Sequence, residues 1–216
     1  MTSKLNILIA DDHPLFRGAL RQAVEGLEPA PGIVEASDFE SARKVAAENP
    51  DSDMLLLDLT MPGMNGLSGL MSLRAEFPGL AIVVVSGSED QATIRRVFEL
   101  GASGFIPKSS GGDAIRAAVR KVAAGGIAEP EGFDPGVEQD AEVSDLINRL
   151  QTLTPQQARV LNMLSEGLLN KQIAYELGVS EATIKAHVSA VLLKLNVDSR
   201  TQAVIQLSKL GQLQAV

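Results

Sequence analysis

The chain has 216 residues and a formal net charge of −8, with 45% hydrophobic, 21% charged and 3% aromatic residues. This is ordinary usage for a globular protein, and the length fits one or two domains. The chain has no cysteine and two histidines, which excludes a disulfide scaffold, a thiolate zinc site and a cysteine nucleophile. No apolar run reaches the roughly 18 residues that span a bilayer, and the start MTSKLN is too polar for a signal peptide. We therefore expect a cytoplasmic protein that does not enter the membrane.

Charge is distributed unevenly along the chain. Residues 1–128 carry 12 basic and 16 acidic side chains, residues 129–151 carry 1 and 7, and residues 152–216 carry 6 and 4. Acid is therefore concentrated in the middle, and the only segment with a positive balance is C-terminal. Such asymmetry says more about binding partners than the total charge does.

Short β-type runs alternate with helical patterns over the first 128 residues. The runs are Leu5–Ala10, Ile33–Ala36, Met54–Asp58, Ala81–Ser86 and Ser103–Pro107. Amphipathic segments lie between them and begin near Pro14, Phe39, Leu67, Ile94 and Ile115, and Asp38 is the expected N-cap of the second. This (βα)5 alternation predicts an α/β domain with a doubly wound parallel sheet covered by helices on both faces.

A segment rich in glycine, proline and acid follows this domain. Residues 125–137, GGIAEPEGFDPGV, hold four Gly, two Pro and three acidic residues, a composition typical of a domain boundary. Residues 138–150 have the apolar spacing of a short helix. The predicted domains are therefore 1–124, an acidic linker over 125–150, and 151–216.

The last part of the chain has the pattern of four short helices. Thr154-Pro155-Gln156-Gln157 is a capping box with proline at the first helical position. A second helix begins at Asn170 and ends at Gly178, a third is capped by Ser180, and a fourth begins at Ser199. The second and third helices, with the short turn between them, have the length of a helix-turn-helix.

Polar residues stand at the carboxyl ends of four predicted strands: Asp11, Asp12, Asp58, Ser86 and Lys108. Ligands of doubly wound sheets bind at this edge. Clustered carboxylates repel and require a cation, and oxygen ligands of this kind suit Mg2+. A carboxylate beside Mg2+ can attack a phosphoryl group and form an acyl phosphate. A lysine and a hydroxyl opposite it would stabilise the added oxygens.

Four segments, ILIADDHP, LLLDLTMPGMNG, VVVSGSED and GFIPKS, make residues 5–124 resemble the receiver domain of two-component response regulators. The resemblance implies a flavodoxin-like fold in which a sensor histidine kinase phosphorylates Asp58. It also implies that Ser86 and Lys108 bind the phosphoryl oxygens, that Phe105 is the switch aromatic, and that Mg2+ is held by Asp11, Asp12, Asp58 and the backbone carbonyl of Thr60. The order Pro107-Lys108 departs from the Lys-Pro of many receivers.

The third C-terminal helix is the expected recognition helix, with its N-terminal half on the bases of the major groove. Ile184, Val188, Val191 and Leu195 account for its inward face. The candidate DNA contacts are the outward and flanking residues, with small hydroxyls and long cations suited to phosphates: Lys171, Ser180, Thr183, Lys185, Ala186, Ser189, Lys194 and Arg200.

The segment from LTPQQARVL to SRTQAV resembles the LuxR-type DNA-binding domain, and the whole chain resembles NarL/FixJ-type response regulators. We therefore predict a phosphorylation-controlled transcription regulator, not an enzyme, that dimerises on activation and binds an inverted-repeat site in double-stranded DNA. Two other functions stay open. One is a Mg2+-dependent phosphohydrolase with Asp58 as nucleophile, although Thr60 stands where such enzymes place a second aspartate. The other is a regulator whose helix-turn-helix binds a protein.

Overall fold

The computed structural model describes residues 4–64, 66–135 and 141–211. By their contacts the residues form two units, one made of residues 1–64 and 77–135, the other of residues 65–76 and 136–216. Within the described ranges, no helix is both long and apolar enough to cross a bilayer.

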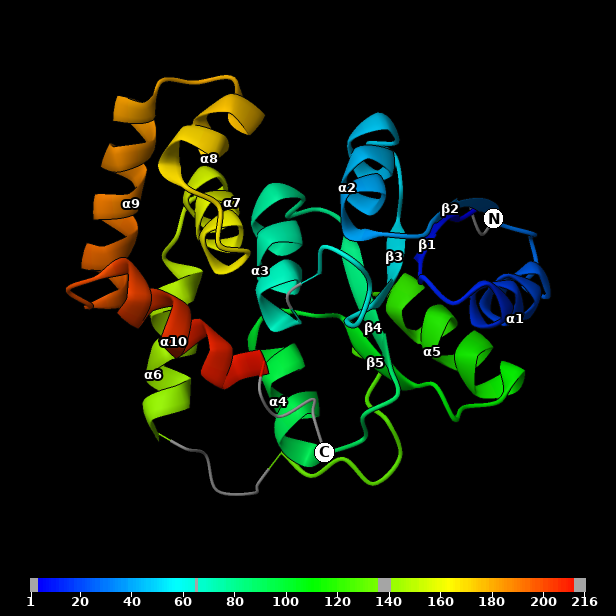
Figure 1. Ribbon diagram of the computed structural model, residues 1–216. Helices are drawn as coiled ribbons and strands as arrows, with labels where there is room; N and C mark the ends of the chain where they lie inside the picture. Colours follow the sequence, from blue (N-terminus) through cyan, green and yellow to red (C-terminus); the bar gives the residue numbers. More distant parts are fainter. Residues whose placement is uncertain (1–3, 65, 136–140, 212–216) are drawn as a thin grey trace. The chain divides into compact units, whose positions relative to one another are not determined.

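A five-stranded parallel sheet forms the centre of the first unit (Figure 1). Its strands are β1 (Asn6–Ala10), β2 (Gly32–Ala36), β3 (Met54–Asp58), β4 (Ala81–Ser86) and β5 (Gly104–Pro107). Their order is β2-β1-β3-β4-β5, and every run expected from the sequence forms a strand. The register places Asp58 opposite Val85 and Ser86 opposite Pro107. The carboxyl ends of β3, β4 and β5 therefore lie side by side.

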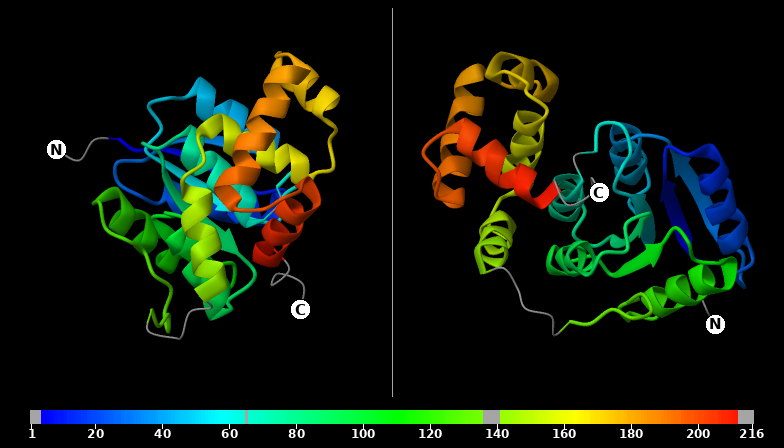
Figure 2. Two further views of the ribbon diagram at one scale, coloured as in Figure 1. Left: turned by 90° about the vertical axis from the view of Figure 1, so that its left-hand side faces the viewer. Right: turned by 60° about the horizontal axis from the view of Figure 1, so that its bottom comes forward.

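Helices cover both faces of this sheet: α1 (Pro14–Glu25), α2 (Phe39–Glu48), α4 (Gln91–Glu99) and α5 (Gly112–Ala123). α1 and α5 lie next to each other on one face, and α2 and α4 lie on the other (Figures 1 and 2). Val24 of α1 and Val119 of α5 pack with Ile9 and Leu56 in a core from which water is excluded. The predicted doubly wound α/β fold is confirmed.

Local signals in the sequence place the ends of these helices. The Asp38 side chain accepts the Ser41 N–H at 2.8 Å, and the Ser41 hydroxyl accepts the Asp38 N–H, so the expected cap of α2 is a capping box. Asp90 caps α4 by accepting the Thr93 N–H at 2.8 Å. Gly101, just after α4, has a φ of 85°, a conformation that only glycine adopts without strain.

The second unit is entirely helical and contains α3 (Leu67–Glu76), α6 (Ala141–Gln151), α7 (Pro155–Ser165), α8 (Asn170–Leu177), α9 (Glu181–Leu195) and α10 (Arg200–Gly211). The helix expected over 138–150 corresponds to α6, and residues 138–140 lie outside the described part. Thr154 caps α7 in a capping box and Ser180 caps α9, as predicted. Buried residues of α7, α8 and α9 share one core: Val160, Leu164, Ile173, Ala174 and Ile184.

The contact units differ from the domains drawn on the sequence. The first unit continues to Pro135, and residues 65–76 group with the C-terminal helices. The limits at residues 124 and 150 remain predictions. They come from the composition of the chain, whereas the two units are defined by which residues contact one another.

Candidate functional site

Two buried carboxylates meet at the carboxyl edge of the sheet. Asp58 ends β3, whose five residues are all buried, and Asp11 follows β1. Both side chains are 0% exposed, whereas that of Asp12 is 27% exposed. Ligand atoms of Asp11, Asp12, His13 and Asp58 all lie within 4.8 Å of one another. The structure therefore brings the three predicted carboxylates together. It adds His13, which is not among the site residues predicted from the sequence.

Lys108 joins the two buried carboxylates. Its Nζ atom lies 2.9 Å from Oδ2 of Asp58 and 2.9 Å from Oδ2 of Asp11. Burial alone would lower the pKa of Lys108, but hydrogen bonds and attraction from Asp58 and Asp11 outweigh it and raise the pKa above its usual value. The ammonium group is therefore fixed where it faces both acids.

Thr60 holds the Asp58 carboxylate from the other side. The Thr60 N–H donates to Asp58 Oδ1 at 3.1 Å, and its hydroxyl lies 2.9 Å from both carboxylate oxygens. Thr60 therefore orients the Asp58 carboxylate with its N–H and hydroxyl groups. Its carbonyl, which we expect to bind the metal, is not used in these contacts. The β3–α3 turn thereby limits the rotation of Asp58.

His13 and Phe16 lie at the site but are not among the site residues predicted from the sequence. His13 is the N-cap residue of α1, and its Nδ1 lies 2.8 Å from Asp12 Oδ1 and 3.5 Å from Asp11 Oδ1. The Phe16 ring centre lies 4.9 Å from Lys108 Nζ, within the range of a cation–π contact. The signal was local: both residues belong to the run DDHPLF that leads from β1 into α1.

The donor set fits a hard divalent cation. Asp11 Oδ1 accepts the His13 N–H at 2.8 Å, but carboxylate oxygens outnumber the cationic groups in the cluster. Mg2+ prefers oxygen ligands and is held by one or two carboxylates while it keeps several waters. Receiver domains in general bind Mg2+ at such an acidic site, and this cluster has the chemistry to hold it.

Ser86 ends β4, the strand next to that of Asp58, and Phe105 lies within β5 opposite Val84. Ser86 is 2% exposed, its hydroxyl accepts the Ser88 N–H at 3.2 Å, and its carbonyl accepts the Lys108 N–H at 2.7 Å. The Phe105 side chain is fully buried. The one cis peptide bond recorded for the described residues joins Glu28 to Pro29, so the peptide after Lys108 is trans.

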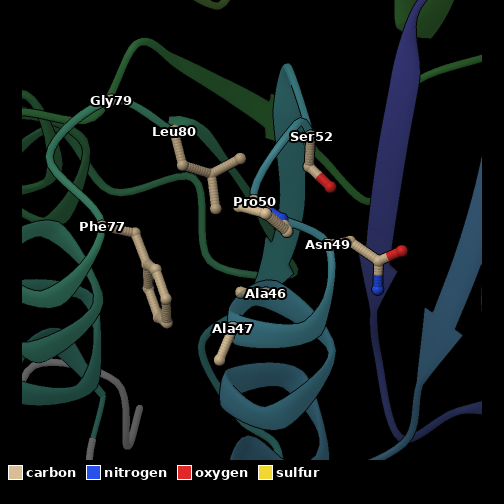
Figure 3. A pocket seen from close by; sticks show the side chains of 8 residues that line it. All are labelled: Ala46, Ala47, Asn49, Pro50, Ser52, Phe77, Gly79 and Leu80. Carbon is tan, nitrogen blue, oxygen red and sulfur yellow. The ribbon is translucent and has the colours of Figure 1, made fainter.

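A separate cavity of about 240 Å³ lies at the opposite edge of the sheet (Figure 3). It is lined by residues before β3, such as Pro50 and Ser52, and residues before β4, such as Phe77 and Leu80. Parallel strands bring their amino ends to this edge, away from Asp58. The cavity therefore takes no part in the acidic cluster.

The helix-turn-helix predicted from the sequence is formed by α8 and α9, which pack against each other (Figure 2). Gly178 has a φ of 64° in the turn between them. Ile184, Val191 and Leu195 of α9 are buried, and Val188 packs against the same core. The predicted outward residues of α9, namely Lys185, Ala186 and Ser189, are exposed.

Residues at the start of α9 are tied to one another. The Ser180 hydroxyl accepts the Thr183 N–H at 3.1 Å and lies 2.8 Å from the Thr183 hydroxyl. Lys185 Nζ forms an exposed ion pair with Glu181 at 3.0 Å. Lys171, the candidate on α8, is exposed. The start of α9 and Lys171 of α8 therefore present hydroxyls and cations to solvent, a combination that suits phosphate.

The remaining two candidate DNA contacts have hydrogen-bond partners elsewhere in the same chain. Lys194 Nζ donates to the Thr152 carbonyl at 2.6 Å and to Gln157 Oε1 at 2.8 Å. The Arg200 guanidinium donates to the Leu168 carbonyl at 2.5 Å. Both side chains thus tie helices together, which the sequence alone did not indicate.

Comparisons with known proteins agree with both halves of this arrangement. Residues 7–120 match the response regulator receiver domain, and residues 151–207 match the luxR family of bacterial regulatory proteins. The chain is 40% identical to the glycerol metabolism activator of Pseudomonas putida, across 92% of this chain and 93% of that protein. It is 36% identical to the nitrate/nitrite response regulator NarP of Escherichia coli K12, across 92% of each. A structure of the response regulator RcsB bound to DNA aligns with a TM-score of 0.55 and 26% identity, over 95% of this chain and 98% of that one.

These matches define a signalling protein in which a receiver domain precedes a LuxR-type DNA-binding domain. The chain belongs to the two-component response regulators of the NarL type. It is a DNA-binding transcriptional regulator and not an enzyme, which decides against the phosphohydrolase interpretation. Its receiver domain implies a histidine kinase as partner.

Proposed function

We propose that Asp58 receives a phosphoryl group from a sensor histidine kinase and that this phosphorylation controls sequence-specific DNA binding by α9. The supporting observation is the position of Lys108, whose ammonium group lies 2.9 Å from both Asp58 and Asp11 within a buried cluster. A structural salt bridge needs one carboxylate, whereas an ammonium group shared by Asp58 and Asp11 is also placed to pair with a phosphoryl group carried by Asp58.

The transfer replaces one bond to phosphorus by another. An Asp58 oxygen attacks the phosphorus of a phosphohistidine, an O–P bond forms as the P–N bond breaks, and the imidazole leaves. Asp11, Asp12, Asp58 and the carbonyl of Thr60 would hold Mg2+, which when bound would supply positive charge against the phosphoryl oxygens. Lys108 pairs with one of these oxygens, and the Ser86 hydroxyl donates to another.

The switch begins at Ser86. Its hydroxyl leaves the Ser88 N–H, where it now lies at 3.2 Å, and turns toward the phosphoryl group. Phe105, on the neighbouring strand β5 two residues before the register partner of Ser86, follows into the space that Ser86 vacates, and the surface of α4, β5 and α5 changes shape. A local change of charge thereby biases an element with two states.

The output is DNA binding by a dimer. The outward side chains of Lys185, Ala186 and Ser189 enter the major groove, while Lys171, Ser180, Thr183, Lys194 and Arg200 approach phosphates, the last two after leaving their present partners. Two-fold symmetry of the phosphorylated dimer predicts an inverted-repeat site. Solved structures of RcsB include two dimers bound to two parallel DNAs, which supports this arrangement.

Incubation with Mg2+ and a small acyl-phosphate donor tests the proposal. We expect one acid-stable, base-labile phosphoryl group by intact-mass spectrometry, and none on Asp58→Asn. Asp51→Asn is the matched control, because Asp51 is exposed in the loop before the same strand. Equal labelling of Asp58→Asn and the wild type would overturn the assignment.

A further inference from the structure

The segment that follows α5 is docked on the first unit, although its composition is that of a linker. Ala128 forms a parallel bridge with Gly104 of β5 and is 3% exposed. The Ala128 N–H donates to the Ser103 carbonyl at 3.0 Å, and the Phe105 N–H donates to the Ala128 carbonyl at 2.8 Å. The chain therefore leaves the sheet edge already hydrogen-bonded to the backbone of Phe105.

Glycine at position 104 permits this approach. A Cβ atom there would lie 3.0 Å from the Ala128 Cβ and 3.3 Å from the Ala128 carbonyl oxygen. Real Cβ atoms rarely tolerate such contacts, so a larger residue would push the two backbones apart. The sequence is thus adapted to bring residue 128 against β5.

Beyond Ala128 the segment crosses α4 and is held there by polar contacts. The Gln91 side chain donates to the Gly132 carbonyl at 3.1 Å and accepts the Asp134 N–H at 3.2 Å. Arg95, one turn further along α4, donates to the Asp134 carbonyl at 2.8 Å. These bonds are made to backbone groups of the segment, so they fix the position of its backbone on α4.

An aromatic pair completes the contact. The rings of Phe133 and Phe98 have centroids 5.3 Å apart and are tilted by 44°, within the preferred geometry of aromatic pairs. Gln91, Arg95 and Phe98 follow the spacing i, i+4, i+7 and so share one face of α4. Figure 1 shows the yellow-green chain running from α5 past β5 to this helix.

We propose that residues 127–135 form a coupling strap, which occupies the Gln91–Arg95–Phe98 face of α4 in the unphosphorylated protein and leaves it when Asp58 is phosphorylated. The proposal rests on the proposed function for the phosphorylation step. Release of the strap would transmit the phosphorylation of Asp58 to the segment that leads to the DNA-binding helices.

The geometry connects the strap to the phosphorylation site at two points. Ser86 ends β4 and Gln91 begins α4, so a shift of Ser86 displaces the first turn of α4. The two Gln91 hydrogen bonds are long, at 3.1 and 3.2 Å, and a further displacement of about 0.5 Å breaks bonds of that length. Phe105 is the second point, because its N–H holds Ala128.

Hydrogen exchange of the full chain, read by mass spectrometry on peptides covering 127–135, tests the strap. We expect slow exchange in the unphosphorylated protein, and exchange about tenfold faster with Mg2+ and the acyl-phosphate donor, since the net loss of one ordinary hydrogen bond shifts an opening equilibrium by roughly that factor. Gln91→Ala and Phe133→Ala should exchange fast without the donor. Glu131→Gln, which changes an exposed charge of the strap and none of these contacts, should match the wild type.

The outcomes separate the strap from the phosphorylation itself, because intact mass reports phosphoryl uptake in the same samples. Uptake without faster exchange of 127–135 overturns the strap proposal alone. Wild-type exchange in both Gln91→Ala and Phe133→Ala overturns the docking contacts. Faster exchange of Asp58→Asn with the donor also contradicts the proposal, since release would then not depend on Asp58. Absence of uptake by the wild type overturns the proposed function and, with it, the release step.

Discussion

Lys108 Nζ lies 2.9 Å from Asp58 Oδ2, although 50 residues separate the two along the chain. The contact exists because β3, β4 and β5 are parallel neighbours whose carboxyl ends meet at one edge. The same ammonium group lies 2.9 Å from Asp11 after β1. One side chain thus links the ends of β1, β3 and β5.

The first prediction concerns the pH dependence that Lys108 gives to stability. Its pKa in the folded protein is raised above the ordinary 10.5 by Asp58 and Asp11. The stabilisation is therefore complete below pH 10.5 and is lost as the pH rises through the folded-state pKa. Chemical denaturation from neutral to alkaline pH should show the free energies of unfolding of wild type and Lys108→Met converging above that pH. Lys121→Met, at an exposed position of α5, should show no such convergence.

The second prediction concerns Lys185 on the outward face of α9. If it contacts a DNA phosphate, Lys185→Ala weakens binding to all sequences and lowers the salt slope by about 1. If it reads a base, the loss is about 1–3 kcal/mol and confined to the preferred site. Titration of one specific and one unrelated duplex at several salt concentrations distinguishes the two. Wild-type behaviour on both duplexes would show that α9 does not face DNA here.

The third prediction concerns Lys194, whose two acceptors belong to Thr152 and Gln157 of the same chain. Lys194→Ala should lower the free energy of unfolding by about 1 kcal/mol, because charged hydrogen bonds are lost at a partly exposed site. Gln157→Ala removes one of the same contacts and also the capping-box bond from the Thr154 N–H, so it should cost a similar amount. A lower salt slope of DNA binding with unchanged stability would show that Lys194 contacts phosphate but that its present partners add nothing to stability.

The fourth prediction compares two glycines that both have open space around them. Gly178 has a φ of 64° at the end of α8, so Gly178→Ala should destabilise the protein by roughly 1 kcal/mol. Gly18 lies inside α1, and Gly18→Ala should stabilise it by about 0.5–1 kcal/mol. Equilibrium denaturation measures both. Equal signs for the two variants would contradict the backbone argument.

The sequence by itself determined the elements and the identity of the acidic cluster. Apolar runs predicted the five strands of the sheet, and amphipathic spacing predicted the helices between them. Asp38, Thr154 and Ser180 act as the helix caps that their positions indicated. These features follow from local rules: side-chain periodicity and the unpaired N–H groups at helix starts. The strand-end residues Asp11, Asp58 and Lys108 could be placed together because parallel topology brings strand ends to one edge.

Only the tertiary structure decided which partner each polar side chain has. Lys194 and Arg200 look like DNA contacts in the sequence, yet both donate to carbonyls from distant parts of the chain. The docking of residues 127–135 on α4 was also hidden, because glycine, proline and acid indicate a linker whatever surface they meet. Long polar side chains and irregular backbone have no periodicity, so their contacts depend on the groups that folding brings within hydrogen-bond distance.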